Sequence, residues 1–402
     1  MKELWMKRIL LLALPAFALI ACASKTPKQD DVFATYVNSY IHAHNIPGAS
    51  FAASRHGKIE YSKGFGFADV ENKVPATEQT VFRIASVSKP ITAVAMFKVL
   101  EEKNMNIEDA LNKPVFGPKG YLPEYKNIKD KRALKVTLRD LLQHTSGLHP
   151  EDDPQYETYK IAKKLHVKSP ASAKDIIRYV LKYQKLDLEP GKEYHYSNFG
   201  YNVLARVIEN VSGEKYEAYV QKHLFAPIGI TDMAIAGNTL KDRRADEAKY
   251  YDDPRHPDIT SALDGKTVGP MAYNGFSFHT MDGHGGWLGT ASDLVKFLNA
   301  VTPGSGAPQL LKPETIRIMT KPVSNIGNPT ASMGFVSAED GKVISHAGAL
   351  ETGTLTYYIR RADGSSWAVL FNRLPVEKID QIKDVMMEFA DNINRIYPVE
   401  TK

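Results

Sequence analysis

Residues 86–102 read SVSKPITAVAMFKVLEE, from Ser86 to Glu102. The first part of this stretch is apolar on nearly every side of a helix, so we expect a helix that is buried all round. Pro90 lacks a backbone N–H and is tolerated only in a first helical turn, which places the helix start near Ser86. Such a helix needs other elements around it, and a chain of 402 residues can supply them.

Ser86 and Lys89 are three residues apart, so on a helix they share one face and their side chains can meet. A serine hydroxyl is a poor nucleophile until a neighbour takes its proton, and a buried lysine with a lowered pKa can do so. The same S-x-x-K pattern recurs at Ser212-Gly213-Glu214-Lys215. There Gly213 follows a helical stripe as a C-cap, so we interpret that copy as structural.

A second polar motif, Tyr196-Ser197-Asn198, precedes the helical stripe of residues 203–211 and is expected in a loop. A tyrosine beside a lysine can act as a phenolate or as a proton shuttle, and an amide can hold a substrate carbonyl. Y-x-N also occurs at Tyr36-Val37-Asn38 and Tyr125-Lys126-Asn127. We interpret both of these copies as structural, one on a helix face and one in a basic loop.

A third motif, His346-Ala347-Gly348, lies among strand-like runs near the C-terminus. A strand edge beside the serine would offer a backbone N–H to an oxyanion, and a glycine there would let a substrate backbone approach closely. The other H-x-G, His284-Gly285-Gly286, lies in a glycine-rich loop and fits this role less well.

Taken together, S-x-x-K at a helix start, Y-x-N 110 residues later and H-x-G after another 150 residues resemble the serine β-lactamase and D-alanyl-D-alanine carboxypeptidase superfamily. The likeness is to the branch related to class C β-lactamases and covers residues 31–395. Three further stretches agree with it: Leu141-Leu142-Gln143-His144-Thr145-Ser146-Gly147-Leu148, Asn198-Phe199-Gly200-Tyr201, and Gly285-Gly286 leading into Thr290-Ala291-Ser292-Asp293-Leu294.

The resemblance implies a role for each motif. Ser86 would be the acylated nucleophile, and Lys89 and Tyr196 would exchange its proton. Asn198 would orient the substrate amide, and the N–H groups of Ser86 and Ala349 would form the oxyanion hole.

His346, with Gly348, stands where class C β-lactamases carry the Lys of K-T-G, a cation that engages the substrate carboxylate. A histidine is mostly neutral at pH 7 and anchors a carboxylate less well. Trp287-Leu288-Gly289 falls too early to be the W-x-G of related esterases, and no Glu-bearing deacylation loop of the class A type is evident. Efficient antibiotic hydrolysis is therefore not expected.

Strand-like runs at both chain ends enclose a helical middle, which predicts an α/β fold of the α+β type. We expect an antiparallel sheet built from both ends and flanked by helices, with an inserted, mostly helical subdomain at about 105–280. This matches the β-lactamase/transpeptidase-like architecture that the resemblance implies. The expected elements are a helix around 32–41, a hairpin at 49–54 and 58–65, strands at 342–345, 354–360 and 367–371, and a helix around 379–393.

The first 21 residues look like a signal peptide, with a positive start and an apolar stretch of 12 residues from Ile9 to Ile20. Leu19-Ile20-Ala21-Cys22 resembles a bacterial lipobox, in which Cys22 is acylated; a cleaved signal with an incidental cysteine is the alternative. We expect a signal peptide at 1–21, a tether at 22–30 and a hydrolase domain at 31–402. Residue 23 is Ala and not Asp, which in lipoproteins of Gram-negative bacteria would favour the outer membrane. We therefore expect the domain to face the periplasm.

The charge composition of the chain limits the classes of partner that we expect it to bind. The chain has 51 Lys+Arg against 46 Asp+Glu, a net charge of +5 and no sustained basic stripe, so nucleic acid is not expected as a partner. We expect a monomer, anchored to a membrane through its lipid, that takes a small-molecule or peptide substrate such as a peptidoglycan stem peptide. No cofactor is expected. No metal is expected either, because prolines break up the one candidate cluster, Asp252, Asp253, His256 and Asp258.

The sequence leaves the reaction open between two enzymatic versions, a D-alanyl-D-alanine carboxypeptidase and a carboxylesterase of small acyl esters. β-Lactamase activity comes third. A different class also remains, a non-catalytic envelope lipoprotein that binds a partner through the same cleft. The intact Ser86, Lys89 and Tyr196 argue against it, because a binding module does not need a buried lysine beside a serine.

Overall fold

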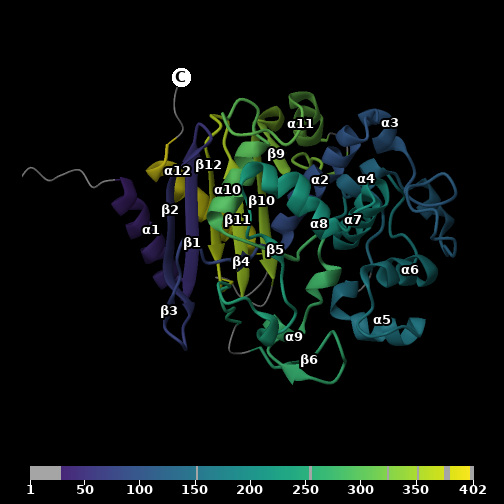
Figure 1. Cartoon of the computed structure of the whole chain (residues 1–402), viewed down its shortest axis with the longest axis horizontal. Helices are drawn as coiled ribbons and strands as arrows, with labels where there is room; N and C mark the ends of the chain where they lie inside the picture. Colours follow the sequence, from purple (N-terminus) through teal and green to yellow (C-terminus); the bar gives the residue numbers. More distant parts are fainter. Residues whose placement is uncertain are drawn as a thin grey trace, which may run out of the picture.

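The computed structural model describes residues 29–150, 153–252, 256–323, 326–350, 353–374 and 381–398. A seven-stranded antiparallel sheet with the order β3-β2-β1-β12-β11-β10-β9 forms its centre (Figure 1). β1 from the N-terminal part pairs with β12 from the C-terminal part, as in Ala52↔Ala368. The predicted sheet built from both ends of the chain is therefore confirmed.

The strands agree closely with the runs expected from the sequence, including the hairpin that turns at His56-Gly57. One difference matters for the site: β10 continues through the H-x-G motif to Leu350 instead of ending before it. The strands of the large sheet are β1 (Gly48–Arg55), β2 (Lys58–Asp69), β3 (Val74–Pro75), β9 (Val336–Ala338), β10 (Val343–Leu350), β11 (Thr354–Arg360) and β12 (Ser366–Phe371).

Alternate residues of the strands face two separate apolar cores. Along β12, Trp367 and Phe371 pack with Phe389 under α1 (Gln29–Ala43) and α12 (Ile382–Ile396). Ala368 and Leu370 point the other way, into the large core that also holds α2 (Ser88–Glu102). Figure 1 shows α1 and α12 together on one side of the sheet and most other helices on the other side. A sheet that is covered on both faces needs apolar residues at successive positions, which explains the unbroken apolar run of β12.

Helix α2 is buried on all sides along most of its length, as its composition predicts. The region expected to be helical, about 105–280, holds helices α3 to α9, and its described strands are two residues long each. The remaining helices are α3 (Ile107–Asn112), α4 (Leu138–Leu142), α5 (Thr158–Leu165), α6 (Ala173–Tyr183), α7 (Asn198–Ser212), α8 (Tyr216–Val220), α9 (Met271–Asn274), α10 (Ala291–Ala300) and α11 (Pro313–Thr320). Within the described ranges, no helix is both long and apolar enough to cross a bilayer.

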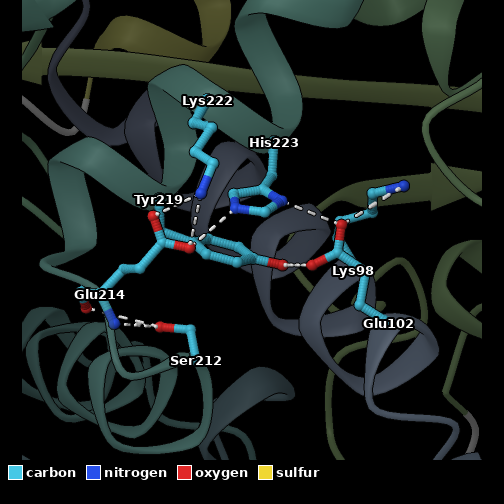
Figure 2. A network of polar contacts seen from close by, with 7 residues as sticks. All are labelled: Lys98, Glu102, Ser212, Glu214, Tyr219, Lys222 and His223. Carbon is cyan, nitrogen blue, oxygen red and sulfur yellow. Dashed lines mark hydrogen bonds and ion pairs between the residues drawn. The ribbon is translucent and has the colours of Figure 1, made fainter.

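The far end of α2 is held by a polar network around His223 (Figure 2). Its Nδ1 lies 3.1 Å from Glu102 Oε1 and its Nε2 lies 2.9 Å from Glu214 Oε1. In the same view, Ser212 Oγ accepts a hydrogen bond from the Glu214 N–H, and Gly213 ends α7 with a φ of 82°. The second S-x-x-K therefore closes a helix, as expected.

A small sheet with the order β4-β8-β5 holds the segment that leads into α2. β4 (Phe82–Arg83) pairs with β8 (Trp287–Gly289), which pairs with β5 (Ala234–Ile235). Arg83 is 1% exposed, and its Nε lies 3.7 Å from Glu247 Oε1. Its guanidinium also lies over the rings of Tyr250 and Phe278, and Nη1 donates to the Ala272 carbonyl. Arg83 thus ties β4 to the 247–278 region just before Ser86.

Replacing Arg83 by Met should destabilise the protein strongly, because Glu247 would be left buried without its cation. We expect a loss of roughly 3–5 kcal/mol in the free energy of unfolding, measured by urea denaturation. Adding Glu247→Gln to Arg83→Met should recover part of that loss. Equal stability of the single and double variants would contradict the ion-pair interpretation.

Candidate active site

The start of α2 places Ser86 in a single 3₁₀ turn, Ala85–Val87, directly before the α-helix. Two hydrogen bonds to β8 hold this turn: the Ile84 N–H donates to the Trp287 carbonyl, and the Trp287 N–H donates to Ser88 Oγ. Ala85 has a φ of 46°, a left-handed conformation that costs energy in any residue with a Cβ. Backbone strain thus lies next to the candidate nucleophile, where it is commonly found in active sites.

Lys89 is completely buried, and its Nζ lies 3.1 Å from Ser86 Oγ. Nζ also lies 2.7 Å from Asn198 Oδ1 and 3.1 Å from the His284 carbonyl, both of which can only accept. A protonated amine would use its three hydrogens on these three oxygens. In the neutral amine, two hydrogens can stay on Asn198 and His284 while the lone pair faces the Ser86 hydroxyl.

Burial lowers the pKa of Lys89 from its usual range to about 7, because an ammonium loses its hydration there. The nearby Asp153 opposes this effect and raises the pKa of the lysine. A substantial fraction of Lys89 is therefore neutral near pH 7. The neutral amine can take the proton of Ser86, as a general base requires.

Tyr196 completes this group from the segment before α7. Its hydroxyl donates to Ser86 Oγ at 2.9 Å, and Lys89 Nζ lies 4.6 Å from the centre of its ring. Burial raises the pKa of Tyr196 well above its usual range, so the phenol stays protonated near pH 7. Of the two roles that the sequence allowed, the structure favours a proton donor and shuttle over a resting phenolate.

The sequence predicted that Y-x-N lies in a loop before a helix that begins near residue 203. This is wrong for Asn198, which is the first residue of α7, so the helix begins earlier than predicted. The N-cap is Ser197, whose Oγ accepts from the Gly200 N–H and so begins the helix early. The side-chain amide of Asn198 accepts from Lys89 through Oδ1 and donates from Nδ2 to Asp153 Oδ2 at 2.6 Å. Asp153 therefore fixes the orientation of this amide.

His346 lies on β10, 9% exposed, and its Nδ1 is 2.6 Å from the Ala347 carbonyl. That oxygen can only accept, so Nδ1 carries the proton and Nε2 of the neutral ring is an acceptor. Burial, helped by the charge of Lys89, lowers the pKa of His346 to about 3. This buried environment agrees with the expectation that the side chain of His346 is mostly neutral.

Gly348 packs tightly against the turn that holds Ser86. A Cβ on this residue would lie 2.3 Å from the Ile84 carbonyl oxygen and 3.0 Å from the Ser86 nitrogen. The glycine therefore lets β10 pack against the protein's own backbone at the turn of Ser86, and the approach of a substrate backbone stays a prediction. Ala349 follows on the same strand, beyond the stretch 343–345 that β9 covers. The two expected oxyanion donors, Ser86 and Ala349, thus lie on neighbouring segments.

Three supporting residues were not identified from the sequence as site residues. His144 stacks on the ring of Tyr196 with centroids 4.7 Å apart, and its Nδ1 accepts from the Ser197 N–H. Its motif was noted but given no role. His284 was set aside, yet its backbone carbonyl holds Lys89. Asp153, in the acidic run 151–153, carried no recognisable signal.

The predicted lipidation site, Cys22, and the whole signal segment lie outside the described residues. In the candidate metal cluster, His256 Nδ1 lies 2.8 Å from Asp252 Oδ1, and Asp253 is not described. Among the residues that are described, no group of three or more His, Cys, Asp and Glu side chains could hold a metal ion.

The amino-acid sequence matches the family model described as Beta-lactamase over residues 31–388. The chain belongs to the beta-lactamase family. Among curated relatives, protein flp of Staphylococcus aureus (strain NCTC 8325 / PS 47) is 26% identical over 324 residues, which cover 79% of this chain and 58% of that protein. The match thus spans little more than half of the relative's length.

Solved structures share the beta-lactamase fold. The D-amino acid amidase of Ochrobactrum anthropi SV3, complexed with D-phenylalanine, aligns with a TM-score of 0.66 at 23% identity and covers 90% of this chain and 99% of its own. EstCE1, described as a hydrolase with promiscuous acyltransferase activity, aligns with a TM-score of 0.65 at 20% identity over 88% of this chain and 96% of its own. At these identities the likeness establishes the fold.

The pH dependence of Ser86 acylation should follow the protonation of Lys89. Because the amine must be neutral to accept a proton, the rate should fall as the pH drops through about 7. Stopped-flow measurement of acylation by an activated ester between pH 5 and 9 checks this. A rate that is constant across that range would contradict a Lys89 base.

Gly348→Ala should displace β10 from the turn of Ser86, because the new methyl would overlap the Ile84 carbonyl. We expect a loss of at least about tenfold in kcat/KM, since the oxyanion donors would move apart by a fraction of an ångström or more. Ala347→Gly, one position away on the same strand, is the matched control and should lose far less. Normal activity of Gly348→Ala would show that the contact is unimportant.

Proposed function

We propose that this protein is a serine hydrolase that forms an acyl-enzyme on Ser86 and acts on small esters or amides. In the first step, the Ser86 proton moves to neutral Lys89 as Oγ bonds to the substrate carbonyl carbon. The negative oxygen would be held by the N–H groups of Ser86 and Ala349. Tyr196 then gives its phenolic proton to the leaving group and regains one from Lys89. In the second step, water attacks the acyl-enzyme, the proton transfers run in the opposite direction, and the acid is released from Ser86.

The protonation state of His346 is the observation that supports this choice of substrate. A neutral ring whose Nε2 is a hydrogen-bond acceptor repels a carboxylate, whereas class C β-lactamases, by the resemblance above, have a cation at this place. Substrates without a carboxylate next to the scissile bond fit better, which favours an esterase or amidase over a β-lactamase.

A D-alanyl-D-alanine carboxypeptidase is the second candidate. The H-x-G motif supports it, because some carboxypeptidases of the superfamily carry the same motif. The expected location in the cell envelope supports it as well, since a peptidoglycan stem peptide would be accessible there. A water molecule or a backbone donor would then have to replace the missing cation beside His346.

We also propose that Cys22 carries a lipid that anchors the protein in the bacterial envelope, with the monomeric domain facing the periplasm. The lipobox-like sequence Leu19-Ile20-Ala21-Cys22 supports this proposal.

A panel of substrates distinguishes the reactions. We expect turnover of p-nitrophenyl acetate and butyrate, little release of D-alanine from a D-Ala-D-Ala peptide, and negligible nitrocefin hydrolysis. Ser86→Ala should abolish all turnover, and so should Lys89→Met, because neither retains the nucleophile and base together. The readouts are p-nitrophenol absorbance, a coupled D-alanine assay and nitrocefin colour.

Two other results would change the proposal. D-alanine release that matches ester turnover would make the carboxypeptidase the better description. Absence of turnover, together with no labelling of Ser86 by a fluorophosphonate, would favour the non-catalytic binding lipoprotein.

Lipidation should be visible as incorporation of an alkyne-tagged palmitate into the protein expressed in a Gram-negative host. Cys22→Ser should lose the label and leave the membrane fraction, because no other cysteine exists in the chain. Equal labelling of Cys22→Ser and the wild type would contradict the proposal of a lipid anchor on Cys22.

A further inference from the structure

Tyr196 lies in a segment without regular secondary structure, residues 194–197, directly before α7. The hydrogen bonds of a helix or a strand therefore do not fix the position of its phenol. A second irregular segment, residues 143–149 after α4, packs against the first one. The contacts between these two segments hold Tyr196 in the site.

Hydrogen bonds join the two segments on both sides of Tyr196. The His195 N–H donates to the His144 carbonyl at 2.8 Å, and the Ser197 N–H donates to His144 Nδ1 at 3.0 Å. The carbonyl of Tyr196 can only accept, so it takes a hydrogen bond from His149 Nδ1 at 2.9 Å. Two of these three hydrogen bonds end on His144.

The ring of His144 also contacts the phenol of Tyr196. The two ring centroids are 4.7 Å apart, and the planes differ by 26°. His144 is 6% exposed and stacks on Tyr201 of α7 as well, with centroids 5.0 Å apart. Because Nδ1 accepts from the Ser197 N–H, the neutral ring carries its proton on Nε2, and burial holds the pKa of His144 well below its usual range. His144 therefore contacts the Tyr196 segment as a neutral ring.

The backbone of His144 has a left-handed conformation, with a φ of 57°. This conformation costs energy in a residue with a Cβ, and such strain is commonly found at functional sites. With this backbone, the carbonyl and the ring of His144 both reach the segment that carries Tyr196.

We propose that His144 is a positioning residue for Tyr196, which aims the phenol at the leaving group of the substrate. The proposal rests on the hydrolase described above, in which the phenolic proton passes to the leaving group as its bond to the acyl carbon breaks. The phenolate then regains a proton from the Lys89 ammonium. A displacement of about 1 Å in such a group can slow the reaction by about 100-fold. Leaving groups that need a proton should show this loss, and leaving groups that depart as stable anions should not.

The test compares two esters with the same acyl part on the full chain at pH 7. p-Nitrophenyl butyrate releases p-nitrophenolate, a stable anion that leaves without a proton, whereas ethyl butyrate releases an alkoxide that must be protonated. Both esters form the same butyryl-enzyme, so the ratio of their kcat/KM values compares acylation alone. His144→Phe keeps a ring but removes the Nδ1 acceptor. We expect it to lower kcat/KM for ethyl butyrate by about tenfold or more, and kcat/KM for p-nitrophenyl butyrate far less.

Three further variants separate positioning from a general structural role. His144→Asn should recover part of the loss, because its amide oxygen can accept from the Ser197 N–H. Tyr201→Phe is the matched control: it keeps the ring that stacks on His144 and removes a hydroxyl that donates to the Leu142 carbonyl, so the ratio should stay unchanged. Tyr196→Phe removes the phenol and should show the same selectivity. In that background, His144→Phe should cause no further selective loss, because it acts through the phenol.

Equal losses on both esters in a folded His144→Phe, as judged by its melting temperature, would overturn the positioning role. A selective loss that persists in the Tyr196→Phe background would also overturn it. If His144→Phe failed to fold, His144→Asn would take its place; it lacks the stacking ring, so a ratio equal to that of the wild type would contradict the proposal.

The wild type separates this proposal from the hydrolase itself. Turnover of p-nitrophenyl butyrate without turnover of ethyl butyrate would show that the phenol does not protonate leaving groups. The positioning role would then fail, and the hydrolase would stand. If neither ester reacted, the hydrolase proposal would fail, and the positioning role would fail with it.

Discussion

The burial of the Lys89 amine beside Ser86 is the constraint on which the rest of the site depends. A lysine in water stays protonated at pH 7 and cannot accept a proton from a serine. Full enclosure lowers its pKa to about 7, and two fixed acceptors, Asn198 Oδ1 and the His284 carbonyl, hold the amine in place. These partners lie 109 and 195 residues away in sequence, so the amine is enclosed only once the whole domain has folded.

The packing of β10 against the start of α2 is the second requirement. Gly348 leaves room for the strand to touch the Ser86 turn, and β8 holds that turn from the other side through Trp287. Because β10 belongs to the sheet in which β1 pairs with β12, both ends of the chain contribute to the framework that holds the two expected oxyanion donors. The strained φ of Ala85 persists within this framework.

The charge of the site differs from the one that the resemblance implies for class C β-lactamases. Where class C enzymes carry a cation, this chain has a neutral histidine on β10, and it also has a carboxylate, Asp153, held by the amide of Asn198. The scaffold and the serine–lysine–tyrosine group can support several acyl transfers. The electrostatic environment of the cleft decides which of these substrates bind.

Local patterns in the sequence determined the start of α2, the N-terminal hairpin, the C-terminal strands and the meeting of Ser86 with Lys89, because each depends on residues a few positions apart. The local context of the other copies of S-x-x-K and Y-x-N likewise led to their interpretation as structural. Only the tertiary structure revealed Asp153, His144 and the backbone of His284. Their roles depend on contacts between distant segments. Every residue has a backbone carbonyl, so the residue type does not indicate which carbonyl will hold Lys89. The pKa of Lys89 likewise depends on how completely the fold removes it from water.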